Sequence, residues 1–196
     1  MTINFTKTWP KSMGRKLSGK PTFFAEKILK TLVDGGVPGI EASLREFAGL
    51  PNHVTDVELF KHFNQFTPKK HTIRGGDRWN AGQVIHFKQW TGEPYNSKTY
   101  NFAPLVRCVS AERVRIRWGE EHGIKTMLVD IEKHNLGRVD WKREGWVQFH
   151  EDGTTTDWGI MHDLAINDGF DNIEDFAKWF DHDFTGQIIH WTNTRY

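Results

Sequence analysis

Apolar residues recur at helical spacing in the first third of the chain. Phe24, Ile28 and Leu32 fall at positions i, i+4 and i+8, which places them on one face of a helix. Pro21 suits the first position of a helix, and the Gly35-Gly36 pair ends the pattern. The sequence therefore predicts a helix between these two signals.

Two further helices are predicted before the pattern changes. The first covers residues 38–50, and the second begins with a capping box formed by Thr55 and Glu58 and ends at Pro68. Residues 36–68 thus form a helical insertion, which is too apolar to remain exposed to water. We expect it to pack on the barrel-like sheet formed by the later strands, beside the HTIR strand, and to form one wall of a cleft there. The side chains at helical spacing that would make this contact are Phe47, Leu59, Phe60, Phe63 and Phe66.

From residue 71 onward the apolar residues alternate, which is typical of strands. A short helix is predicted near 159–167, a second helix is capped by Asn172, and a final strand covers 186–192. The pattern predicts one α+β domain over residues 1–196, with a small barrel-like antiparallel sheet of about six to seven strands flanked by helices. The other predicted strands are 71–74, 84–90, 100–110, 112–118, 125–131 and 145–150.

Composition places the chain among ordinary globular proteins. Of its 196 residues, 37% are hydrophobic and 26% are charged. The chain has no apolar run of membrane-spanning length and no apolar block typical of a signal peptide, and its single cysteine, Cys108, fits a reducing cytosol. We therefore expect a cytoplasmic protein with no membrane partner, in which the polar residues 1–20 form an irregular arm.

The net charge of +1 conceals a strong asymmetry along the chain. Residues 1–30 carry seven Lys or Arg against one Glu, whereas residues 151–183 carry ten Asp or Glu against one Lys. A globally basic nucleic-acid-binding protein is excluded, but a local basic face is compatible with this distribution. Nine tryptophans are also unusually many, and tryptophan concentrates in cores, in interfaces and against bases.

Residues 69–79 gather hydrogen-bond donors at one predicted strand and turn. In an extended strand Lys70, Thr72 and Arg74 share one face, while His71 and Ile73 share the other. We expect Ile73 to enter the core, which leaves Thr72 and Arg74 facing a cleft or solvent. The residues alone are compatible with a solvated rim, a grip on a phosphate or base, or a catalytic site.

Several segments in order resemble the ASCH family of the PUA-like superfamily, and most closely its larger members from bacteriophages and prophages. The shared elements are a Lys-x-His-Thr-Ile-Arg strand, here 69–74, and an Arg-Trp-x-x-Gly turn, here 78–82. They are followed by Gly-x-Pro-Tyr at 92–95 and by the segment Ala-Ile-Asn-Asp-Gly-Phe at 165–170. The resemblance covers roughly residues 21–33 and 69–192.

This resemblance implies a small β-barrel flanked by helices, with a cleft beside the first helices. Relatives bind RNA or modified nucleobases, some resemble amidohydrolases that remove acyl groups from acylated cytidine, and others have been assigned ribonuclease activity. The reactive set of the amidohydrolase type corresponds here to Lys69, Thr72 and Asp168, with Arg74 matching the Arg that follows the Thr. Two departures stand out: Asp168 replaces a Glu, and about 35 residues are inserted before the HTIR strand.

Chemistry leaves three interpretations of this set open. Lys69 can act as the base that activates the Thr72 hydroxyl if desolvation lowers the pKa of its amine. A neighbouring carboxylate favours the charged amine, so Asp168 can instead be the base, with Lys69 or Arg74 stabilising developing negative charge. In the third interpretation Arg74 and Asp168 form a structural salt bridge.

The leading expectation is a module that binds RNA or a modified nucleoside. Its cationic cleft uses Lys69, Lys70, Arg74 and Arg78 for phosphate or carbonyl oxygens, and Trp79 and Tyr95 for stacking. The alternatives are the hydrolase, either N-acyl nucleoside amidohydrolase or ribonuclease, and a phage-encoded protein that meets a host protein through the acidic 151–183 face or the helical insertion. No cofactor or metal is expected, because the ten His include no HExxH motif and one cysteine cannot build a zinc cluster.

Overall fold

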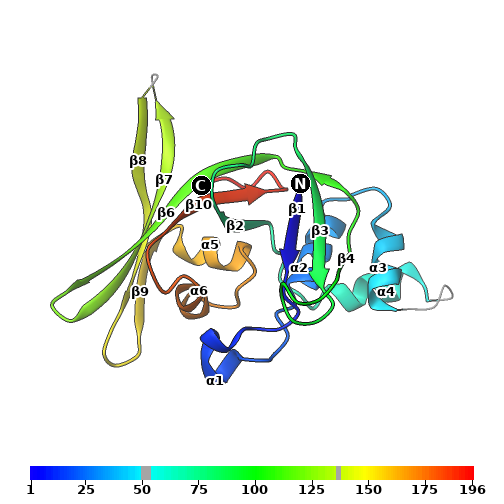
Figure 1. Cartoon of the computed structure of the whole chain (residues 1–196), viewed down its shortest axis with the longest axis horizontal. Coiled ribbons are helices and arrows are strands. Elements are labelled where there is room, and N and C mark those ends of the chain that lie inside the picture. Colours follow the sequence, from blue (N-terminus) through cyan, green and yellow to red (C-terminus); the bar gives the residue numbers. More distant parts are fainter. Residues whose placement is uncertain (50–53, 136–137) are drawn as a thin grey trace. The chain divides into compact units, whose positions relative to one another are not determined.

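The computed structural model describes residues 1–49, 54–135 and 138–196, in which the chain forms two compact units (Figure 1). The first unit contains Met1–Lys70 and Gly82–Cys108, and the second contains His71–Ala81 and Val109–Tyr196. The sequence predicts one domain over residues 1–196, and in the structure this range divides into two compact units. None of the helices in these described ranges has both the length and the apolar character that a membrane span requires.

The first unit combines a small sheet with the helices of the amino-terminal part. β1 runs parallel to β3, and β4 and β5 are antiparallel to β3. The polar segment predicted as an irregular arm therefore begins with a strand, in which Ile3 and Phe5 are buried. The elements are β1 (Thr2–Phe5), η1 (Lys11–Met13), α1 (Gly14–Leu17), α2 (Phe24–Asp34), α3 (Ile40–Ala48), α4 (Asp56–Phe63), β3 (Val84–Trp90), β4 (Thr99–Asn101) and β5 (Val106–Arg107).

Aromatic and aliphatic side chains form the core of the first unit. The predicted stripe of α2 is confirmed, because Phe24, Ile28 and Leu32 are all buried. The Phe5 ring lies 6.2 Å from the ring of Phe24 and 6.2 Å from that of Phe87, which joins α2 to β1 and β3. Burial of such apolar surface is the main favourable term in folding.

The insertion helices pack within the first unit. The predicted capping box is confirmed: the Thr55 hydroxyl accepts the Glu58 N–H at 3.3 Å, and the Glu58 carboxylate accepts the Thr55 N–H at 3.0 Å. Phe63 is fully buried, and Phe47 lies 6.0 Å from Phe102 between ring centres. The second predicted helix is shorter than expected, and Leu50, its predicted last residue, lies outside the described residues.

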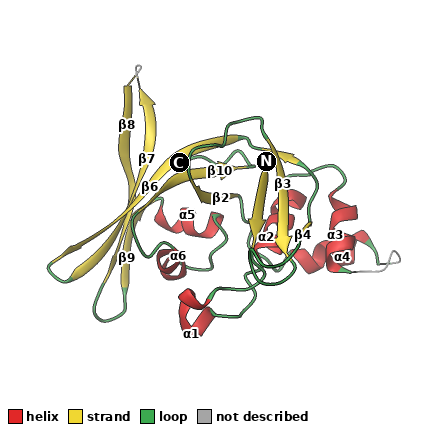
Figure 2. Ribbon diagram, viewed as in Figure 1, coloured by secondary structure: helices red, strands yellow, loops and turns green. Residues whose placement is uncertain are grey.

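The second unit is a six-stranded antiparallel sheet with two short helices (Figure 2). Its strand order is β2-β10-β6-β7-β8-β9. β6, β7 and β8 each run for 12 residues and are longer than the strands predicted there. The elements are β2 (His71–Gly75), β6 (Ser110–Glu121), β7 (Ile124–Asn135), β8 (Arg138–Phe149), β9 (Thr155–Gly159), α5 (Met161–Asn167), α6 (Ile173–Trp179) and β10 (Phe184–His190).

The α+β class is confirmed, but the described strands form two open sheets and no closed barrel. The physical reason lies in the pairing of β3. This strand pairs with β1, β4 and β5 in the first unit, so it cannot extend the larger sheet. β2 and β9 therefore remain as the two edges of the six-stranded sheet.

Two different faces result from the alternation of side chains in this sheet. α5 and α6 cover one face, which we call the helix-covered face. There Gly145 leaves room for the Met161 side chain of α5, and the Trp118 indole donates to the Phe180 carbonyl at 2.6 Å. Buried strand residues line this face: Val114, Ile116, Met127, Val129 and Val147.

Candidate nucleic-acid interface

β2 carries the two strand residues that the sequence analysis placed on one face. Thr72 pairs with Ile189 and Arg74 pairs with Gln187 across the β2–β10 ladder, so Thr72 and Arg74 share a face. Ile73 lies on the opposite face and is buried, as predicted. Thr72 is also buried, at 3% exposure, whereas Arg74 is partly exposed.

Lys69, the first residue of the predicted reactive set, belongs to the first unit. Its N–H donates to the Lys27 carbonyl at 3.0 Å, and its carbonyl accepts from the Thr31 hydroxyl at 2.7 Å. Its ammonium lies 4.9 Å from the centre of the Phe24 ring, which gives a buried cation–π contact. α2 therefore fixes both the backbone and the side chain of Lys69. Lys70, which follows it, is partly exposed.

Asp168 lies at the end of α5 in the second unit, and its carboxylate is tied to β2. One carboxylate oxygen accepts the backbone N–H of Ile73 at 3.2 Å, and Asp168 is 4% exposed. A buried carboxylate needs such donors to offset the loss of water. This contact brings Asp168 to the residue next to Thr72. The catalytic roles of Lys69, Thr72 and Asp168 remain predictions.

The remaining predicted binding residues differ in their exposure. The Gln187 side chain accepts the Trp79 N–H at 2.9 Å and donates to the Trp79 carbonyl at 3.0 Å. Trp79 is 3% exposed, so its ring packs in the interior and is not presented for stacking on a base. Arg78 is exposed in the same loop, and Tyr95, in the first unit, is 90% exposed.

The opposite face of the sheet carries an ordered set of arginines and tryptophans, which we call the arginine face. Cross-strand pairing in β6, β7, β8 and β9 aligns its residues in rows, because directly opposed residues project to the same side. The rows are Arg113, Glu132 and Trp141; Arg115, Asp130 and Arg143; Arg117, Leu128, Trp146 and Trp158; and Gly119, Thr126, Gln148 and Thr156.

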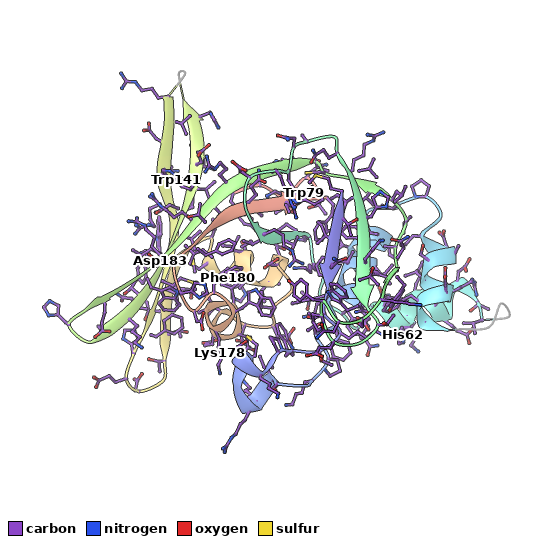
Figure 3. All side chains as sticks on the ribbon, viewed as in Figure 1. His62, Trp79, Trp141, Lys178, Phe180 and Asp183 are labelled. Atoms are coloured by element: carbon purple, nitrogen blue, oxygen red, sulfur yellow. The ribbon has the colours of Figure 1, made fainter. Side chains whose placement is uncertain are left out.

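A buried carboxylate organises the first rows. Asp130 contacts the guanidinium groups of Arg143 at 2.5 Å, Arg117 at 2.8 Å and Arg115 at 3.1 Å. The Arg115 guanidinium also lies 4.6 Å from the centre of the Trp141 ring, on the β7–β8 hairpin (Figure 3). Guanidinium groups stack well on indole rings, so these contacts hold the side chains in a layer over the strands.

The arginine face is a local excess of positive charge in an acidic unit. The second unit carries twelve Lys or Arg and eighteen Asp or Glu. In contrast, the rows of this face contain two carboxylates, Asp130 and Glu132, and four arginines: Arg113, Arg115, Arg117 and Arg143. The Arg113 and Arg117 side chains are 44% and 41% exposed, so they retain donors directed to water. Positive charge and indole rings on one exposed face can hold a chain of phosphates and bases.

The sequence predicts residues 112–118 as a strand but indicates no site there. The available signal was the alternation of arginine with apolar residues at 113, 115 and 117, which places three guanidinium groups on one side of a strand. The tryptophans come from other strands, and only the register of the sheet brings them to this face.

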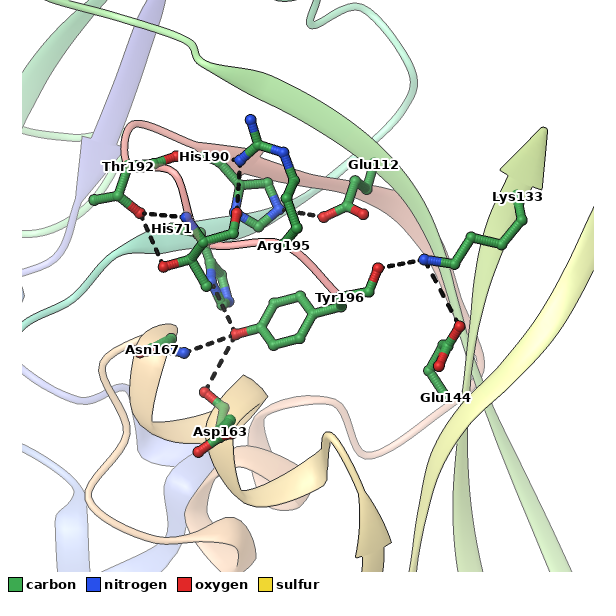
Figure 4. A network of polar contacts seen from close by, with 11 residues as sticks. His71, Glu112, Lys133, Glu144, Asp163, Asn167, His190, Thr192, Arg195 and Tyr196 are labelled. Carbon is green, nitrogen blue, oxygen red and sulfur yellow. Dashed lines mark hydrogen bonds and ion pairs between the residues drawn. The ribbon is translucent and has the colours of Figure 1, made fainter. Parts of the chain in front are cut away.

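The helix-covered face holds a polar network instead (Figure 4). The Tyr196 hydroxyl accepts from the Asn167 amide at 2.9 Å and donates to the Asp163 carbonyl at 3.3 Å. Burial, followed by the charges of nearby carboxylates, raises the pKa of Tyr196 well above its ordinary value. The phenol therefore stays protonated and acts as a hydrogen-bonding group. His190 and Glu112 form a second contact there, at 2.7 Å.

Asp130 makes the stability of the protein depend on pH. Burial raises the pKa of Asp130, but the hydrogen bonds from Arg143 and Arg115 and the arginine charges outweigh that effect and lower it below its ordinary value. The folded state therefore gains stability from ionised Asp130 above about pH 4, the unfolded value, and loses it as the pH falls through the depressed folded pKa.

We expect Asp130→Asn to be less stable than wild type at pH 7 and this difference to shrink as the pH falls below about 4. Urea unfolding followed by tryptophan fluorescence between about pH 3 and pH 7 measures both effects. Asp157→Asn, at an exposed carboxylate of β9, is the control and should follow wild type at every pH. A constant stability difference between Asp130→Asn and wild type would contradict this assignment.

The chain matches no protein-family model, no curated protein and no solved structure.

Proposed function

We propose that the protein binds single-stranded RNA across the arginine face of its second unit. The observation that supports this best is the set of exposed and partly exposed guanidinium groups and indole rings on neighbouring rows of one sheet face. Single-stranded nucleic acids are held by cationic surfaces that follow the phosphates and by aromatic rings on which bases stack. The resemblance to the ASCH family implies RNA or a modified nucleobase as the ligand, and membership of that family is part of this proposal.

Charge and exposure favour a polyanion as the ligand. The second unit as a whole is acidic, so the rows that contain Arg113, Arg115, Arg117 and Arg143 form a local region that attracts phosphate. Trp158, at 56% exposure, offers an open ring on the edge strand β9. Its indole can stack only on bases that are not already stacked in a duplex, which favours a single strand.

Fluorescence anisotropy with a labelled RNA of about 12 nucleotides tests the proposal, because the site size of such surfaces is of this order. Trp158→Ala should weaken binding about 5- to 150-fold, the effect of losing one stacked base. Arg117→Ala should reduce the slope of log affinity against log salt by about 0.7, the value for one phosphate contact on a single strand.

Tyr95→Ala is the matched control, because Tyr95 is an exposed aromatic residue of the first unit and should bind RNA like wild type. Single-stranded DNA and duplex RNA form the comparison arms of the same assay. No binding to single-stranded RNA, or equal losses in Trp158→Ala and Tyr95→Ala, would overturn the proposal. A preference for duplex over single strand would overturn it as well.

A further inference from the structure

A hollow lies at the end of the arginine face, beside the row of Arg117 and Trp158. Its volume is about 370 Å³, and it opens on the same side of the sheet as the arginines. Residues from β6, β7 and β8 line it: Gly119, Glu120, Thr126, Leu128, Trp146 and Gln148.

Gly119 creates this space. Its φ lies outside the left-handed region, and a Cβ placed on it would meet no atom within 4 Å, so neither the backbone nor close packing requires glycine. Glycine in a strand weakens the strand and often marks a position that another group approaches. Since Thr126, its cross-strand partner, is also small, the row remains open to a ligand.

The lining combines an aromatic surface with polar groups of complementary kinds. Trp146 is partly exposed and offers a ring face, while the Gln148 amide supplies donors and an acceptor. Within the described part of the chain, the Gln148 amide and the Thr126 hydroxyl form no side-chain hydrogen bond, so both groups are available to a ligand.

We propose that this hollow is a subsite that selects adenine in the bound RNA; it rests on the proposed function of the arginine face. A glutamine amide pairs with adenine in a bidentate manner, accepting from the exocyclic amine and donating to the adjacent ring nitrogen. The amide oxygen of Gln148 accepts from this amine and repels a carbonyl oxygen in its place. Uracil presents a carbonyl where adenine and cytosine present the amine, and a purine covers more of the Trp146 ring than a pyrimidine does.

The subsite predicts a ranking of bases. In a run of uridines with one central variable position, adenine should bind more tightly than cytosine, and cytosine more tightly than uracil. The affinity ratio of adenine to uracil should be about 10-fold or more, as for one bidentate contact. Gly119→Val, which suits a strand and fills the hollow, should reduce this ratio to about one while binding of the all-uridine RNA stays unchanged.

Gln148→Leu is a second variant of similar size that removes only the amide, and it should lose the same preference. Thr156→Val is the matched control in the same row, outside the hollow, and should keep the wild-type ratio. Equal affinity of wild type for the adenine and uracil RNAs would overturn the subsite, while the proposed function would stand.

Adenosine monophosphate tests the hollow without an RNA chain. We expect it to shift the NMR signal of the Trp146 indole N–H in wild type, and to shift it much less in Gly119→Val; uridine monophosphate should have little effect on either protein. If no RNA binds, the proposed function fails, but a selective shift by the adenine nucleotide would still support the subsite. Equal shifts by both nucleotides, or an undiminished shift in Gly119→Val, would overturn it.

Discussion

Replacing Phe63 with alanine should lower the free energy of unfolding of the protein by about 3–5 kcal/mol. Phe63 is fully buried in α4, and its ring centre lies 6.5 Å from those of both Phe47 and Phe66. The loss combines the transfer of a large apolar side chain to water with the cavity that remains in a close-packed core. It is a large share of the stability of a typical domain, about 5–15 kcal/mol.

Urea unfolding followed by circular dichroism and tryptophan fluorescence measures this loss. Val57→Ala is the control, because Val57 lies in the same helix and is 77% exposed, so its truncation should change stability by less than about 0.5 kcal/mol. A loss in Phe63→Ala no larger than that of the control would show that the insertion helices do not contribute to the core of the first unit.

Local signals explain why the helices of the first unit could be predicted. The apolar stripe of α2 and the capping box of α4 depend on residues within two or three turns, and both appear in the structure. The strand at Thr2–Phe5 had no such signal. It exists because it pairs in parallel with β3, more than 80 residues away, and a four-residue polar and apolar segment does not reveal that partner.

The sequence could predict the candidate site only where the alternation of side chains along a single strand determines the face on which they lie. The shared face of Thr72 and Arg74 follows from the period of two, whereas Trp79 is buried and its backbone is bound by Gln187, 108 residues away, which no local pattern reveals. The arginine face depends on an irregularity as well. Arg143 and Trp146, three residues apart, would lie on opposite faces of a regular strand.

A β-bulge resolves this conflict of spacing. The register of the β7–β8 ladder shifts between Val129 and Asp130, so that Arg143 pairs with Asp130 and Trp146 pairs with Leu128 on the same face. The single extra residue of β8 thus brings a guanidinium group and an indole ring into neighbouring rows. Such a shift has no reliable signature in the sequence of one strand, so the arginine face could not be foreseen from it, and the cationic cleft at residues 69–79 stays a prediction.

Replacing Gly186 with alanine should destabilise the second unit by about 3 kcal/mol, the upper range for overpacking, because the clash involves backbone. A Cβ on Gly186 would lie 2.1 Å from the Arg74 carbonyl oxygen, a distance that no side-chain rotation can relieve. β10 and β2 would have to separate there, and β2 carries Thr72 and Arg74. We therefore expect lower resistance to urea and faster amide hydrogen exchange in β2.

Gly75→Ala provides a control directly across the same ladder. Gly75 pairs with Gly186, but a Cβ on Gly75 would meet only the Phe184 ring, at 3.8 Å, which is an ordinary contact. Because alanine restricts the unfolded chain more than glycine does, Gly75→Ala should leave stability unchanged or raise it by about 0.5 kcal/mol. Equal destabilisation by the two substitutions would show that the Gly75–Gly186 pair tolerates a side chain on neither strand. If Gly186→Ala is as stable as wild type, the backbones of β2 and β10 do not approach each other as closely at Arg74 as the β2–β10 pairing places them.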